Sequence, residues 1–102
     1  MTDLDSYRIK IDEIDREITK LFEERMNVVL NVAEYKLENN LPIFNKERED
    51  KVIQKNIGYL ENKDYAFELE EFYNNLMNVS RKFQKRKIQE EKNAKSIEEL
   101  NK

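Results

Sequence analysis

The fold is decided by residues 3–39, which read DLDSYRIKIDEIDREITKLFEERMNVVLNVAEYKLEN. This stretch contains neither Gly nor Pro, the two residues that most disfavour a helix interior. Its apolar residues recur at alternating steps of three and four, which places them on one face of a helix. These residues, called the apolar stripe below, are Leu4, Tyr7, Ile11, Ile14, Ile18, Leu21, Val28, Val32 and Tyr35. The spacing predicts one long helix from Thr2 or Asp3 to Asn39.

A helix of this length cannot be covered by the rest of its own chain. About 36 residues at a rise of about 1.5 Å each give a rod of about 54 Å. A compact domain of about 100 residues has a radius of gyration of only about 13 Å. The apolar stripe therefore needs a partner, and we expect a homodimer.

A break and a second helix follow. The segment Asn39–Pro42 combines two turn formers with a proline, which biases Leu41 away from helical angles. Asn45 is a good N-cap for a helix over residues 46–57. Gly58 is the expected C-cap of that helix.

A third helix is expected from near Tyr65 to at least Ile88. Its apolar positions are Leu69, Phe72, Leu76, Val79 and Phe83. The remaining segment, residues 89–102, is charged almost throughout, and we expect it to fray. The fold class is thus all-α, with three helices in a single domain over 1–102 and a core over about 4–88.

Composition excludes several kinds of chemistry. With no Cys and no His, the chain cannot form a disulfide scaffold, a zinc finger, a catalytic thiol or a Ser-His triad. The balance of 19 basic and 22 acidic residues offers no overall field for nucleic acid or a membrane. Residues 1–6 lack the features of a signal peptide, and no apolar run is long enough to span a bilayer. We expect a cytoplasmic protein without a metal, a nucleic acid or a membrane partner.

Two cations interrupt the apolar pattern of the first helix. Arg25 occupies a position of the apolar stripe, where a guanidinium is costly unless an anion meets it. That anion is either a Glu of a neighbouring helix or a bound ligand. Lys36 lies eleven residues further on, within about 20° of the same helix face and about 16 Å along the axis. The two side chains are therefore placed to grip a small dianion between them.

Other polar residues have two interpretations each. Arg48 and Glu49 lie in the first turn of the second helix, a favourable place for an anion but also one where charges are common. Ser80 and Gln84 share a face of the third helix, either as a site or as a solvated flank. A basic cluster is interpreted as a solvated face; it comprises Arg81, Lys82, Lys85, Arg86 and Lys87.

Taken together, these residues resemble the all-helical, AroQ-class chorismate mutases. The run Tyr7–Asp15 followed by Glu24-Arg25-Met26 is similar to the first helix of that family. The remaining matches are Lys36, Pro42-Ile43, Arg48-Glu49 and Ser80-x-x-x-Gln84. The resemblance covers about residues 4–86. It implies an intertwined homodimer that converts chorismate to prephenate without a cofactor.

The resemblance also implies a role for each polar residue. Arg25 and Arg48 would bind the substrate carboxylates with help from Ser80, and Arg8 would do so from the partner subunit. Lys36 and Gln84 would donate hydrogen bonds to the ether oxygen of the breaking bond, as catalytic residues. Glu49 would hold the ring hydroxyl. Asn45 stands where the family often has Asp, and both residues cap helices well.

Two other functions stay open at this point. Isochorismate-pyruvate lyases share the fold and several of the cations, but they lack the acidic residue at Glu49 and the hydroxyl at Ser80. A non-catalytic helical interaction module would show the same apolar stripe. Such a module has no need of Arg25 on that stripe or of Lys36 on the same face.

Overall fold

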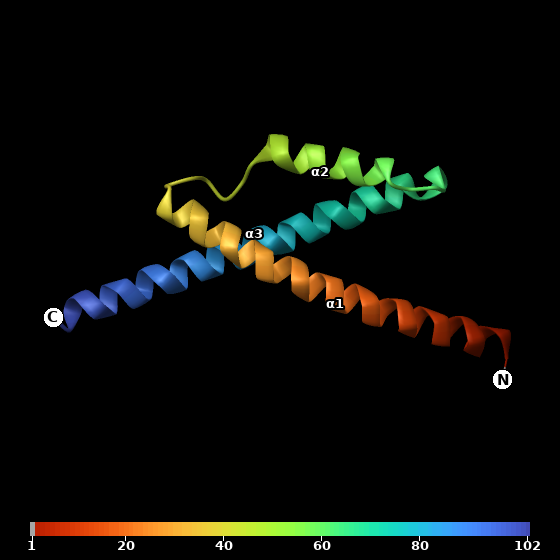
Figure 1. Ribbon diagram of the computed structural model, residues 1–102, viewed down its shortest axis with the longest axis horizontal. Coiled ribbons are helices and arrows are strands. Elements are labelled where there is room, and N and C mark those ends of the chain that lie inside the picture. The colour runs from red at the N-terminus through yellow and green to blue at the C-terminus, as the bar shows by residue number, and fades with distance from the viewer. Residues whose placement is uncertain (1) are drawn as a thin grey trace.

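A computed structural model describes residues 2–102 as three helices and one short helical turn. The elements are α1 (Asp3–Glu38), α2 (Lys46–Gly58), the 3-10 turn η1 (Lys63–Tyr65) and α3 (Ala66–Leu100). Figure 1 shows α1 and α3 crossing, with α2 running from the C-terminal end of α1 to the N-terminal end of α3. The all-α expectation is confirmed. Within residues 2–102 no helix is both long and apolar enough to cross a bilayer.

The limits of α1 are set by local hydrogen bonds. Thr2 and Asp5 form a capping box, in which the Thr2 hydroxyl accepts from the Asp5 backbone N–H at 3.1 Å. Hydrogen bonds from Thr2 also lower the pKa of Asp5. At the other end, Asn39 caps the helix and Asn40 takes a left-handed φ of 54°, which Asn tolerates better than most residues. The predicted bounds of the first helix are confirmed to within a residue.

The second helix begins as predicted, but its C-terminus differs. Asn45 accepts a hydrogen bond from the Arg48 backbone N–H at 3.0 Å, which confirms it as the N-cap. Gly58 is the last helical residue rather than the cap, and its φ is not positive. The final carbonyls are satisfied instead by the Lys63 ammonium, which donates to Ile57 at 2.9 Å and to Gly58 at 3.2 Å. A left-handed glycine is therefore not needed.

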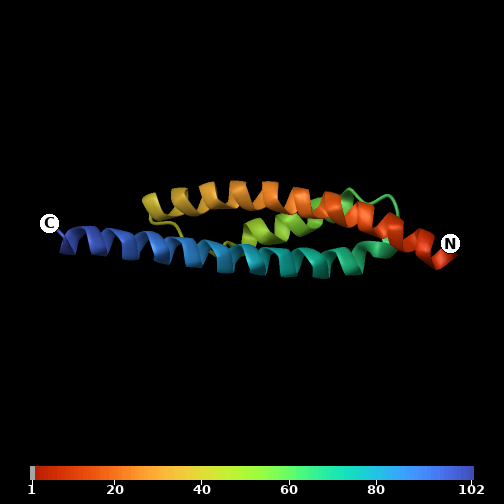
Figure 2. The same cartoon turned by 90° about the horizontal axis from the view of Figure 1, so that it is seen from below.

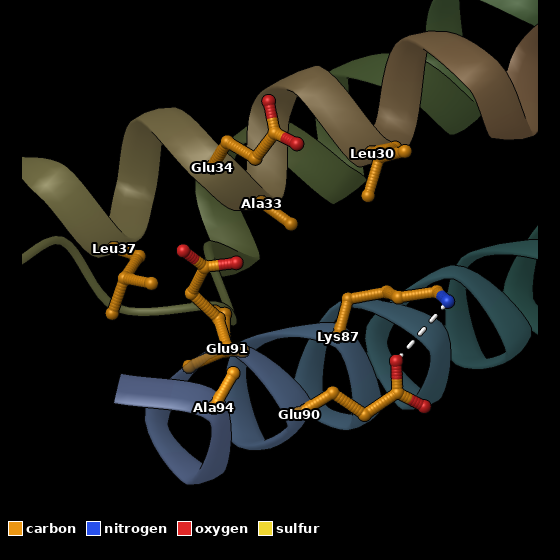
Figure 3. A pocket seen from close by; sticks show the side chains of 9 residues that line it. Leu30, Ala33, Glu34, Leu37, Lys87, Glu90, Glu91 and Ala94 are labelled. Carbon is orange, nitrogen blue, oxygen red and sulfur yellow. Dashed lines mark hydrogen bonds and ion pairs between the residues drawn. The ribbon is translucent and has the colours of Figure 1, made fainter. Parts of the chain in front are cut away.

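The expectation that residues 89–102 fray is wrong for residues 89–100, which continue α3 as far as Leu100. This segment lacks Gly and Pro and is rich in helix formers. Gln89 donates to Asn93 at 3.0 Å within it. Figure 3 shows Ala33 and Leu37 of α1 facing the turns of α3 that carry Glu91 and Ala94. The extension of α3 thus lies across a cavity of about 310 Å³ from the C-terminal end of α1, and residues 89–100 are all exposed.

The chain forms a thin, elongated slab with little interior. Its extents are 66 × 34 × 15 Å and its radius of gyration is 18.6 Å, against about 13 Å for a compact domain of this size. Figure 2 shows α1 along one side of the slab and α3 along the other. Among the described residues, the buried apolar side chains are Ala33, Ile53 and Met77. The interior alone is too small to hold such long helices together.

The apolar stripe of α1 is exposed along its whole length among residues 2–102. In its N-terminal half the side chains are 48–65% exposed: Leu4, Tyr7, Ile11, Ile14, Ile18 and Leu21. In its C-terminal half Val28 and Tyr35 are 60% and 61% exposed. An unbroken row of large apolar side chains in water is costly, at roughly 25 cal/mol for each Å² of apolar surface. The row is therefore an exposed apolar surface of α1.

Gly58→Ala should stabilise the chain by about 0.5 kcal/mol. An alanine Cβ at this position meets no atom within 4 Å, and the backbone conformation suits any residue. Alanine also restricts the unfolded chain and favours the helix. Urea unfolding followed by circular dichroism measures the change. A loss of stability would mean that this position needs the freedom of glycine.

Candidate active site

A cavity of about 280 Å³ lies where the three helices meet. Its walls come from the second half of α1, the linker between α1 and α2, the first half of α2 and the middle of α3. Seven of the eight site residues predicted from the sequence line it, namely Arg25, Lys36, Asn45, Arg48, Glu49, Ser80 and Gln84. The eighth, Arg8, is exposed on the N-terminal half of α1 and does not line this cavity. Residues far apart in the sequence thus converge on one small space.

Arg25 reaches into the cavity without a carboxylate partner among residues 2–102. Its guanidinium donates to the Ser80 hydroxyl at 2.8 Å, and Ser80 in turn donates to the Leu76 carbonyl at 2.9 Å. Ser80 is only 5% exposed, so this contact is well fixed. The alternative of a buried ion pair with a neighbouring Glu is therefore wrong. A neutral partner orients the guanidinium and leaves its charge available to a ligand.

Lys36 joins α1 to the linker on the far side of the cavity. Its ammonium donates to the Ile43 carbonyl at 2.7 Å. Partial burial lowers the pKa of Lys36, and the nearby charge of Glu49 opposes this shift to a smaller extent. The ammonium thus loses part of its hydration without gaining an ion pair, which strengthens its attraction for an incoming anion.

Gln84 presents an amide to the same cavity from α3. The side chain is 6% exposed, and its Oε1 is the single buried side-chain nitrogen or oxygen atom without a hydrogen-bond partner within residues 2–102. Burying an amide oxygen is costly unless a donor meets it. Within residues 2–102, the unmet requirement of Gln84 is therefore a donor to its Oε1.

Glu49 and Arg81 form an ion pair across the cavity wall, between α2 and α3. The two side chains are 19% and 29% exposed. The interpretation of Arg81 as part of a solvated basic face is wrong, because its guanidinium lies against Glu49 and 5.1 Å from the ring centroid of Phe44. Lys82, Lys85 and Arg86 are exposed, as expected for that face.

Arg81 is the charged lining residue that the sequence did not place in the site. A signal was present, because Met77, Ser80, Arg81 and Gln84 follow the helical spacing i, i+3, i+4, i+7 that defines one face. Two of these four residues, Ser80 and Gln84, had already been singled out as candidate site residues. Arg81 was instead grouped with the basic residues that follow it in the sequence.

The cavity carries an excess of positive charge in a chain whose net charge is −3. Its lining includes four cations and one carboxylate: Arg25, Lys36, Arg48, Arg81 and Glu49. Since Arg81 is occupied by Glu49, three cations remain to meet a ligand. The first turn of α2 adds the positive end of the helix dipole. This arrangement suits a small molecule with two negative charges.

The sequence matches the family model for chorismate mutase type II over residues 7–85. The chain belongs to this family. The match runs from α1 to the middle of α3 and includes every residue that lines the cavity. The resemblance noted from the polar residues is therefore confirmed.

Several curated proteins are similar to part of this chorismate mutase type II domain. A bifunctional chorismate mutase/prephenate dehydratase of Buchnera aphidicola (subsp. Schizaphis graminum) is 45% identical over 58 residues, which cover 55% of this chain and 15% of that protein. A protein of the same description from Aquifex aeolicus is 40% identical over 55 residues, or 54% of this chain and 15% of its own length. The T-protein of Haemophilus influenzae is 39% identical over 54 residues, or 53% and 14%.

The chain thus spans only a small fraction, 13–15%, of the length of the curated relatives it matches. No solved structure matches it. The family assignment rests on the family model and on these partial relatives.

The Lys36 ammonium should titrate below the ordinary lysine pKa of 10.5, because burial disfavours its charged form. Lys46 should titrate above 10.5, since its hydrogen bond to Asp50 favours the charged form. Glu49→Gln should lower the pKa of Lys36 further, as it removes the charge that opposes the burial effect, and should leave Lys46 unchanged. Lysine side-chain NMR across an alkaline titration measures all three values. A rise in the pKa of Lys36 in the Glu49→Gln variant would contradict this electrostatic description.

Proposed function

We propose that this chain, as a single domain over residues 1–102, is a chorismate mutase that rearranges chorismate to prephenate in aromatic amino acid biosynthesis. The observation that carries the proposal is the meeting of seven polar side chains in one cavity with an excess of positive charge. All seven lie within the residues that the family model matches. Chorismate is a small dianion, and three unpaired cations line the cavity. A dianion does not cross membranes unaided, which favours the cytoplasm as the place of the reaction.

The reaction suits the residues that are present. In this intramolecular rearrangement the ether C–O bond breaks as a new C–C bond forms, and no proton, electron or group is exchanged with the protein. The reaction therefore needs neither the general base nor the nucleophile that His or Cys would supply, and this chain has neither residue. The protein has to hold the substrate in a compact conformer and stabilise the negative charge that grows on the ether oxygen.

Three groups are proposed to orient the substrate carboxylates. Arg25, held by Ser80, faces the cavity without a competing carboxylate. Arg48 lies in the first turn of α2, where the helix dipole adds to its charge. A third cation is proposed to come from Arg8 of the partner subunit. Glu49 is proposed to accept the hydrogen bond of the ring hydroxyl, while Asn45 caps α2 and places its backbone beside the same group.

Lys36 and Gln84 are the proposed catalytic residues. The Lys36 ammonium is partly stripped of water, and the Gln84 amide has no partner for its buried oxygen. Both line the cavity from different helices, α1 and α3. Donors fixed in advance on two sides stabilise the ether oxygen most when its charge is greatest, which is in the transition state.

A homodimer is proposed to complete the site. Arg8 precedes Arg25 by 17 residues, which is about 25 Å along α1 and roughly 100° around it, so one helix cannot direct both at one small molecule. The exposed N-terminal half of the apolar stripe is the surface that a second copy would cover. An antiparallel, intertwined pair of α1 helices brings Arg8 of the partner subunit towards the cavity.

The test of this function is direct. Purified protein is mixed with chorismate, and the loss of its ultraviolet absorbance and the appearance of prephenate are followed. Isochorismate is assayed in parallel for pyruvate release. The lining of the cavity by Glu49 and Ser80 favours prephenate. Pyruvate release without prephenate formation would assign the chain to the lyases, and no turnover of either would leave a binding module.

Lys36→Ala should lower kcat by about 10²–10³-fold, or roughly 3–4 kcal/mol, by analogy with the loss of one oxyanion-hole donor. KM should change much less, because the lost bond strengthens only as charge develops. Steady-state kinetics measure both constants. Lys46→Ala is the matched control, as this exposed lysine pairs only with Asp50 among the described residues. An effect confined to KM would remove Lys36 from the catalytic role.

Mixing two inactive variants tests the shared site. Arg8→Ala and Lys36→Ala should each be nearly inactive, because every site lacks one group. In a mixed dimer one site receives both intact residues and the other carries both lesions. Random pairing gives about half mixed dimers, so co-refolding should restore about a quarter of the wild-type activity. If mixing restores nothing although the subunits exchange, Arg8 serves its own chain and the intertwined arrangement is wrong.

A further inference from the structure

The ion pair between Glu49 and Arg81 joins α2 to α3 at the wall of the cavity. We propose that Arg81 is a positioning residue that holds the Glu49 carboxylate against α3 and so keeps it from pairing with Lys36. The proposal deepens the proposed function and rests on it for the effect on reaction rate. Its effect on the Lys36 ammonium stands independently of that function.

The contacts of Arg81 fix both partners of the pair. The guanidinium bonds the Glu49 carboxylate on α2, and its carbon atom lies 5.1 Å from the ring centroid of Phe44 in the linker. A planar guanidinium that stacks on a ring and bonds a carboxylate has few orientations left. With side chains 29% and 19% exposed, Arg81 and Glu49 are also screened less by water than the exposed pairs elsewhere on the chain. The carboxylate is therefore held on one side of the cavity.

Without this restraint, Glu49 has another cation within reach. Glu49 and Lys36 line the same cavity, and the charge of Glu49 already acts on the Lys36 ammonium. A released carboxylate gains by turning towards that ammonium, which has no ion-pair partner among residues 2–102. Such a pair would occupy the donor proposed for the ether oxygen. An unneutralised carboxylate would also repel a dianionic substrate.

The cations of the cavity therefore fall into two groups, one paired with a carboxylate and one bonded to neutral oxygens. Arg81 neutralises the one carboxylate of the lining, while Arg25 and Lys36 are held by the neutral oxygens of Ser80 and Ile43. Of the four cations in the lining, Arg81 is the one that pairs with a carboxylate within residues 2–102. Substituting Arg81 should therefore impair the reaction through Glu49 and not through a lost substrate contact.

A double-mutant cycle of Arg81→Gln and Glu49→Gln tests this dependence. Arg81→Gln alone should lower kcat about tenfold, and the same change in the Glu49→Gln background should lower it less than about threefold, since no carboxylate remains to be restrained. Arg81→Lys should restore part of the loss, because it keeps the charge without the planar fork. Lys85→Gln, an exposed substitution one turn further along α3, should leave kcat unchanged. Equal losses in both backgrounds, or a change in KM alone, would overturn the proposal.

The Lys36 pKa gives a second measurement that does not depend on turnover. By lysine side-chain NMR, Arg81→Gln should raise it more in the wild-type background than in the Glu49→Gln background, because only the former contains a carboxylate free to approach. Arg81→Lys provides the same comparison if Arg81→Gln fails to fold, with a smaller rise. An equal change in both backgrounds would refute the restraint. If the wild-type chain does not turn over chorismate, the proposed function fails and this comparison alone decides the role of Arg81.

Discussion

The structure depends on the mismatch between the length of α1 and the amount of chain available to cover it. α1 has 36 residues, and α3 crosses it but leaves its apolar stripe exposed. The slab that results is 15 Å thick and buries few apolar side chains of its own. Polar groups take part of this interior, since Ser80 and Gln84 are as buried as Ile53. The chain thus encloses a cavity lined by polar side chains and leaves much of its apolar surface outside.

Two cations of the cavity, Arg25 and Lys36, hydrogen-bond to neutral oxygens, so their positive charge is not neutralised. A carboxylate partner neutralises the charge of a guanidinium or an ammonium and weakens its attraction for a ligand anion. A hydroxyl or carbonyl partner orients the cation but does not neutralise it. Arg25 and Lys36 follow the second pattern and Arg81 the first. The same space therefore contains both free and neutralised cations, each fixed by a different kind of hydrogen bond.

Local signals in the sequence predicted the elements well where they acted alone. The unbroken three-four spacing located α1, and Asn45 marked the start of α2. Prediction failed where a hydrogen bond from outside the element replaced the local one that the sequence suggested. Lys63 satisfies the carbonyls of Ile57 and Gly58, for which a left-handed Gly58 cap was expected. The pairing of Arg81 with Glu49 spans 32 residues and two helices, which no local spacing encodes.

The uncovered row of apolar side chains on α1 also sets how the protein responds to dilution. If a second copy covers that row, association and folding draw on the same buried surface, and mass action makes the melting temperature depend on protomer concentration. A site shared between subunits would then disappear on dissociation, even where each helix survived. Specific activity, which for a monomeric enzyme is independent of dilution, would fall once the protein is diluted below its dimer dissociation constant.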